Sequence, residues 1–171
     1  GYVRLWGIDI AGKKIVAMDR YLPYFYIEVA SDMENERGLE EIRERLRGLK
    51  EFEGDGIKSV ELVSKKLLGE EKKFIKIVLK NPKDVQKLRD IVKNWDGVRE
   101  EYEYDITLYR RYLIDKGIIP MNWVRVIGTK VESKNGGDIE VMVEDIEMIN
   151  RDIPALNVLA FDIEMGSNDI I

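Results

Sequence analysis

The apolar positions of the first hundred residues follow two different periods. Residues 36–49 carry leucine and isoleucine at intervals of three or four, which predicts an amphipathic helix. A second helix is predicted from Asn81-Pro82 to a stop near Gly97, because asparagine caps helices, proline fits the first helical position and glycine ends them. Shorter runs rich in β-branched and aromatic residues predict strands over 24–29, 57–68, 73–80 and 98–104.

The predicted elements of residues 24–104 therefore occur in the order strand, helix, strand, strand, helix, strand. This split βαβ order is typical of ferredoxin-like folds, which RNA-recognition domains (RRM-like folds) share. We therefore expect an α+β fold with a ferredoxin-like βαββαβ subdomain. The other predicted strands, expected to form a small, partial antiparallel barrel, cover 2–10, 14–22, 122–132 and 138–148, the last two joined by an Asn-Gly turn. A third helix is predicted from a cap at Asp105 to Gly117.

The absence of two residue types narrows the possible chemistry. The chain contains no cysteine and no histidine, so it has no disulfide, thiolate ligand, histidine base or Ser-His-Asp triad of its own. Any metal it binds has oxygen ligands, which favours Mg²⁺, Mn²⁺ or Ca²⁺. No apolar run approaches the roughly 20 residues of a membrane span, so we expect a cytoplasmic protein with no membrane partner.

Charge is distributed unevenly along the chain. The formal net charge is −5, which alone argues against a simple nucleic-acid binder. However, residues 58–93 contain 11 basic and 5 acidic side chains, whereas residues 132–169 contain 2 basic and 10 acidic ones. A basic middle can face phosphates, and an acidic end can hold a cation.

A pair of carboxylates lies near the end of the chain. Asp162 and Glu164 follow the apolar run 158–161, which predicts a buried strand with both side chains on the same side of its end. Two-metal nucleases use such carboxylates to bind the cations that activate water. The triplet is also common as two solvated acids, and the remaining ligands of such a site must come from elsewhere.

Four segments resemble archaeal family-B DNA polymerases, in the right order. Residues 158–164 resemble the first motif of the proofreading exonuclease, and residues 104–121 resemble the segment that leads into it. The other two matching segments are Tyr21–Tyr26 and Asn81–Arg89.

The resemblance implies two parts. Residues 1–156 correspond to the polymerase N-terminal domain, with the ferredoxin-like core at about 24–104, and residues 157–171 correspond to the first strand of a truncated 3′–5′ exonuclease domain. The expected partners are the single-stranded DNA template and the rest of the polymerase chain. The resemblance implies Mg²⁺ or Mn²⁺ for the full-length enzyme, with no bound metal and no catalysis by this fragment alone.

In this family the N-terminal domain captures uracil in the template strand. The residues that match its pocket are Pro23, Tyr24, Pro82, Val85, Arg89 and Arg111. Proline and valine can form a tight wall for a flat pyrimidine, backbone amides can read its edge, and the arginines can hold flanking phosphates. The chain departs from many relatives at Thr107 and Leu108, so one wall of the pocket differs.

Other interpretations remain open for the same residues. Val85 lies on the apolar stripe of its helix, and Pro82 is explained by helix initiation alone. A general RRM-like binder of single-stranded DNA or RNA would instead stack bases on exposed aromatics, with Tyr26 and Phe74 as candidates. A third interpretation is an interaction subunit of a split polymerase, which would need a partner chain.

Overall fold

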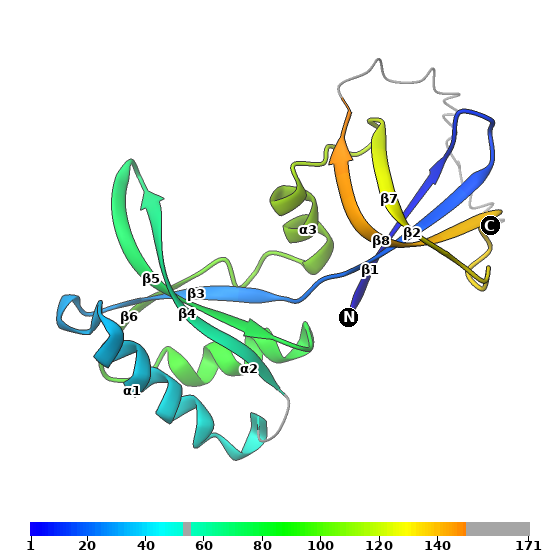
Figure 1. Ribbon diagram of the computed structural model, residues 1–171. Helices are drawn as coiled ribbons and strands as arrows, with labels where there is room; N and C mark the ends of the chain where they lie inside the picture. Colours follow the sequence, from blue (N-terminus) through cyan, green and yellow to red (C-terminus); the bar gives the residue numbers. More distant parts are fainter. Residues whose placement is uncertain (53–55, 150–171) are drawn as a thin grey trace, which may run out of the picture.

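The computed structural model describes residues 1–52 and 56–149, which form two four-stranded sheets and three α-helices (Figure 1). The core sheet has the order β4 (Ile57–Leu67), β5 (Glu70–Leu79), β3 (Tyr24–Val29) and β6 (Val98–Tyr102). The flanking sheet has the order β1 (Tyr2–Ile8), β2 (Lys14–Arg20), β8 (Ile139–Met148) and β7 (Val124–Val131). The helices are α1 (Glu36–Arg47), α2 (Lys83–Val92) and α3 (Leu108–Lys116).

The core sheet confirms the predicted ferredoxin-like subdomain. Its strands and helices follow one another as β3, α1, β4, β5, α2 and β6, and every pair of neighbouring strands is antiparallel. Both helices cover the same face of the sheet (Figure 1), where Phe25, Ile27 and Val29 alternate inward along β3. Full burial of such a side chain contributes about 1.5–3 kcal/mol, so these residues stabilise the packing of both helices on the sheet.

Helix α2 begins at Lys83, one residue later than the sequence predicted, and it also ends earlier. The Asn81 side-chain oxygen accepts a hydrogen bond from the Lys83 amide at 3.1 Å and so caps the first turn. The regular helix ends at Val92 rather than at the predicted stop. Gly97, with a φ of 85°, instead forms the turn that leads into β6.

The flanking sheet joins two hairpins that lie far apart in the sequence. Each hairpin is antiparallel, as predicted, but β2 pairs with β8 in parallel, with Ile15 opposite Ile139 and Met18 opposite Met142. The expected antiparallel arrangement therefore holds within the hairpins and not between them. In the described residues β1 and β7 are the two edges of this sheet, which stays open, as a partial barrel does.

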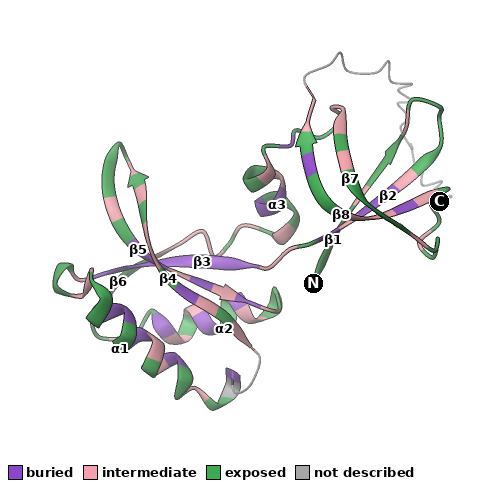
Figure 2. Ribbon diagram, viewed as in Figure 1, coloured by how far each residue is buried: buried purple, intermediate pink, exposed green. Residues whose placement is uncertain are grey.

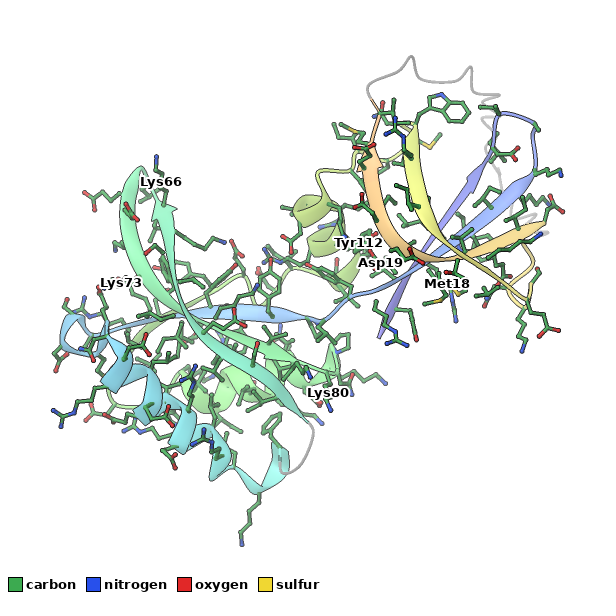
Figure 3. All side chains as sticks on the ribbon, viewed as in Figure 1. Met18, Asp19, Lys66, Lys73, Lys80 and Tyr112 are labelled. Carbon is green, nitrogen blue, oxygen red and sulfur yellow. The ribbon has the colours of Figure 1, made fainter. Side chains whose placement is uncertain are left out.

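Helix α3 connects the two sheets. Its Tyr112 side chain is fully buried against the flanking sheet, and the phenol donates a hydrogen bond to the Asp19 carboxylate at 2.9 Å (Figure 3). The helix begins after Thr107, two residues later than the predicted cap at Asp105. Its predicted end is confirmed, because Gly117 adopts a left-handed conformation with a φ of 62°.

The β4–β5 hairpin extends beyond the two helices and ends in an exposed turn (Figure 2). Leu68 and Gly69 both have a positive φ, at 51° and 91°, as a two-residue hairpin turn of type I′ requires. The turn is therefore earlier than the predicted one at 69–72, and β5 begins at Glu70. The hairpin carries Lys66 and Lys73 on its outer part (Figure 3).

Candidate functional site

A hollow of about 310 Å³ lies where the start of β3, the first turn of α2 and the segment before α3 meet. The residues that line it are Pro23, Tyr24, Pro82, Lys83, Val85, Gln86, Tyr104, Asp105, Ile106, Thr107, Leu108 and Arg111. Three segments that are far apart in the sequence thus build one concave surface. Its volume is at the small end of the range of ligand pockets, about 300–1,000 Å³.

The hollow brings together five of the six residues that the family resemblance singled out. Pro23 and Tyr24 form one side of it, Pro82 and Val85 a second, and Arg111 a third. Val85 is also part of the hydrophobic core of the core sheet, so it packs in the core and lines the hollow at the same time.

The sixth residue, Arg89, lies behind the hollow. Its guanidinium carbon is 4.1 Å from the centroid of the Tyr104 ring, and Tyr104 itself lines the hollow. One guanidinium nitrogen donates to the Tyr104 hydroxyl at 3.0 Å, and another lies 3.2 Å from a Glu101 carboxylate oxygen. Arg89 therefore supports Tyr104 from the α2 side and forms no part of the wall.

The backbone around the hollow is held by short local contacts. The Leu79 amide donates to the Pro23 carbonyl at 2.9 Å and fixes the entry into β3 beside the exit from β5. The first turns of α2 and α3 both border the hollow. Because the N-terminal end of a helix carries a partial positive charge and free amides, both helices favour acceptor atoms at this place.

Arg111 is almost fully buried at the wall of the hollow. It forms an ion pair of 2.6 Å with Glu103, and its guanidinium carbon is 4.8 Å from the centroid of the Tyr24 ring. Burial alone would lower the pKa of Arg111, but its electrostatic interactions with Tyr24 and Glu103 outweigh burial and raise the pKa. Arg111 is therefore a charged wall residue that is already paired, rather than a cation free to hold an external phosphate.

The partner of Arg111 has an unusual backbone. Glu103 has a φ of 64°, which non-glycine residues rarely adopt and which costs on the order of 1–3 kcal/mol. Its carboxylate also lies 3.4 Å from the Lys65 ammonium of β4. The turn at Glu103 thus brings the chain from β6 into the hollow and holds Arg111 there.

Tyr24 is fixed from the side of α3. Its hydroxyl donates to the Asp115 carboxylate, and the Tyr21 hydroxyl donates to the same carboxylate oxygen. Burial and the hydrogen bond to Asp115 raise the pKa of Tyr24 well above its ordinary value, so Tyr24 is a neutral donor at physiological pH.

The aromatic residues of the uncovered face of the core sheet are not exposed. Tyr26 and Phe74, the candidates for base stacking in a general RRM-like binder, retain 7% and 4% of their accessible surface. The Lys65 ammonium lies 4.0 Å from the centroid of the Tyr26 ring and covers it. Bases cannot stack on these two rings as they are placed, so this geometry disfavours the general RRM-like interpretation.

The sequence interpretation missed several residues of the hollow. Tyr104, Ile106 and Gln86 line it but were not among the candidate site residues. Tyr104 offered one signal, as an aromatic residue just after a predicted strand and before a predicted helix. Thr107 and Leu108, where the chain departs from many relatives, do form one wall.

The predicted metal ligands Asp162 and Glu164 lie outside the described residues. Within residues 1–52 and 56–149, no group of three or more acidic side chains is arranged to hold a metal ion. The described helices include none that is both long enough and apolar enough to cross a membrane.

Comparison with known proteins gives the same family for both ends of the chain. Residues 99–170 match the family model of the DNA polymerase family B exonuclease domain. A DNA polymerase of Methanocaldococcus jannaschii is 37% identical over 77% of the chain, and DNA polymerase 2 of Aeropyrum pernix is 31% identical over 95% of it. The chain spans only 8% and 21% of the lengths of these two relatives.

A solved structure supports the same relationship at the level of the fold. The family B DNA polymerase of Pyrobaculum calidifontis superimposes with a TM-score of 0.67 and 30% sequence identity. The match covers 91% of this chain and 19% of that polymerase.

Proposed function

Since this chain belongs with the archaeal family-B DNA polymerases, we propose that its hollow captures a uracil base of a single-stranded DNA template. The observation that carries the proposal is the convergence of Pro23-Tyr24, Pro82-Val85 and Arg111 on one base-sized space. In this proposal the chain senses the template strand for the rest of the polymerase, and both are its partners.

The chemistry of the walls supports uracil over the other pyrimidines. The first turns of α2 and α3 favour acceptor atoms, and uracil presents carbonyl oxygens at C2 and C4. Thymine carries an additional methyl group, which a tight wall of Val85 and Leu108 would exclude. Cytosine presents an amino donor in place of the C4 carbonyl, so donors would face each other and remain unpaired.

We also propose the division of the chain and its place in the whole enzyme. Residues 1–156 act as the N-terminal domain, and residues 157–171 contribute the first strand of a 3′–5′ exonuclease domain. Asp162 and Glu164 serve there as ligands of Mg²⁺ or Mn²⁺, together with carboxylates from elsewhere. The whole protein is then a DNA-directed DNA polymerase with proofreading, and this chain alone has no catalytic activity.

A binding titration tests the capture of uracil. The full chain is titrated with fluorescent single strands that differ at one central position, which holds uracil, thymine or cytosine, at one fixed salt concentration. We expect tighter binding to the uracil strand. Equal affinity for the uracil and thymine strands would overturn the proposal.

One variant ties this preference to the hollow. Val85→Phe fills the space, so the preference for uracil should disappear while binding to the thymine strand stays the same. The matched control is Lys87→Phe, on the same helix but exposed and away from the hollow. A Lys87→Phe variant that loses the preference as well would show that the loss comes from a damaged helix.

A further inference from the structure

The two arginines expected to hold phosphates beside the hollow are already occupied. Arg111 is paired with Glu103, and Arg89 lies between Glu101, Asp90 and the Tyr104 ring. To bind a phosphate, either side chain would first have to break a carboxylate contact, which offsets the gain. A strand whose base enters the hollow must therefore find its cations elsewhere.

Lys76 is the first such cation. It lies on β5, and its ammonium is 4.0 Å from the centroid of the Tyr24 ring, which itself lines the hollow. Its cross-strand neighbour is Glu61, whose carboxylate accepts a hydrogen bond from Ser59. Among the described contacts, Lys76 has no ion pair with Glu61 or with any other carboxylate.

Lys83 is the second cation, at the start of α2. It is the first residue of α2, it lines the hollow, and it is exposed. A lysine in the first turn of a helix opposes the helix dipole, which favours acidic residues there. Such a break of a local rule is expected where a residue serves binding rather than stability.

The acidic groups near the two lysines limit where an anion can lie. Asp105 is on the rim of the hollow, and Asp84 follows Lys83 in the first turn of α2, where it lies 3.8 Å from Lys87. Asp84 and Asp105 repel a phosphate, as does Asp115 beyond the Tyr24 hydroxyl, so an anion is favoured only close to the ammonium groups of the two lysines. Lys83 lines the hollow, and the Lys76 ammonium lies against the ring of Tyr24, which lines it as well.

We propose that Lys76 and Lys83, rather than Arg89 and Arg111, hold the two phosphates that flank a base bound in the hollow. Their ammonium groups act as point charges for phosphate oxygens, while the buried Arg111 shapes the wall. This inference rests on the proposed function for the position of the base, but it concerns the backbone of the strand and applies to any pyrimidine.

The salt dependence of binding tests the inference. The chain and its Lys76→Gln and Lys83→Gln variants are titrated with the uracil and thymine strands at several salt concentrations. Each lost phosphate contact should lower the slope of log K against log salt by about 0.7. Affinity should fall several-fold for both strands, so that the ratio between uracil and thymine stays unchanged.

The matched control is Lys66→Gln, an exposed lysine of the same sheet near the tip of the hairpin (Figure 3). Lys66 is paired in register with Glu71, five residues from Lys76 along β5, which corresponds to roughly 17 Å. Its replacement should leave the slope unchanged. Equal slopes for all four proteins, or an equal loss in the Lys66 control, would overturn the inference.

The two proposals fail in different ways. If the strands bind with equal affinity but the slope falls in the Lys76 and Lys83 variants, uracil capture is wrong and the phosphate contacts stand. If uracil is preferred and only Arg89→Gln and Arg111→Gln lower the slope, the hollow is right and the assignment of the lysines is wrong.

Discussion

The Tyr24 hydroxyl donates a 2.6 Å hydrogen bond to the Asp115 carboxylate and thereby ties the first residue of β3 to the last turn of α3. Arg111, one turn earlier on the same helix, lies over the Tyr24 ring. Helix α3 is packed by Tyr112 against the flanking sheet. The wall of the hollow therefore depends on both sheets, although its other residues belong to the core sheet and the segment that follows it.

Tyr24→Phe should loosen this wall without removing the ring. The variant loses the hydrogen bond to Asp115, which keeps Tyr21 as a donor, so the free energy of unfolding should fall by about 1 kcal/mol. The preference for uracil should decrease because the wall is less rigid. Chemical denaturation and strand titration measure the two effects, and Tyr109→Phe, on the exposed side of α3, serves as the control. An unchanged preference would show that the hydrogen bond does not shape the hollow.

Leu108→Ala should widen the hollow on the side where the chain departs from many relatives. A methyl-sized space next to the base admits thymine, so the ratio of the uracil to the thymine affinity should fall roughly tenfold. Leu113→Ala removes a partly buried leucine of the same cluster that does not line the hollow, and it should leave the ratio unchanged. If the two variants behave alike, Leu108 does not contact the base.

Tyr112 should make the chain sensitive to alkaline pH. Burial and the hydrogen bond to Asp19 raise the pKa of Tyr112, so the folded chain keeps its proton at a pH where the unfolded chain, with a pKa near 10, loses it. The contribution of Tyr112 to the free energy of unfolding is complete below about pH 10. It is lost as the pH rises towards the pKa of Tyr112 in the folded chain. Unfolding free energy measured from pH 8 to 11 should therefore decrease more steeply for the wild type than for Tyr112→Phe. Parallel curves would contradict this.

Glu140 should contribute stability that is lost in acid. Its carboxylate is buried and accepts hydrogen bonds from Ser133, Lys134 and Asn135. Burial alone would raise the pKa of Glu140, but these hydrogen bonds outweigh it and lower the pKa.

The stabilisation is therefore present above the ordinary glutamate pKa and disappears as the pH falls through the lower folded value. Glu140→Gln should reduce the unfolding free energy clearly at pH 7 and much less at pH 3. Glu132→Gln changes an exposed glutamate of the same hairpin and should have little effect at either pH. An equal loss at both values would mean that the glutamine disrupts packing rather than a charge.

The order of the elements was predictable because each one has a local signal. The alternation in β3 and the Asn81-Pro82 start of α2 are visible in a few neighbouring residues, and the antiparallel core sheet follows from their order. The start of α3 was misplaced because Asp105 is a good capping residue by type, whereas the chain enters the helix only after Thr107. A residue type that favours the N-cap position therefore does not by itself determine where the helix begins.

The partners of the charged residues were not predictable in this way. The resemblance placed Arg89 and Arg111 at a phosphate, but their guanidinium groups meet Glu101 and Glu103, which belong to another segment. The parallel pairing of β2 with β8 likewise has no signal in either strand. Both depend on contacts between residues distant in sequence, which periodicity does not encode.

The pairing of β2 with β8 also sets the order in which the molecule can be assembled. Lys14 and Asp138 are 124 positions apart, so β2 cannot pair with β8 until all the residues between them have been synthesised. The core sheet and its two helices need only residues 24–102 and can close first. The base-sized hollow is complete only after Leu108 and Arg111 have been added and α3 has docked, so the binding of a base that we propose for it becomes possible only late in the folding of these residues.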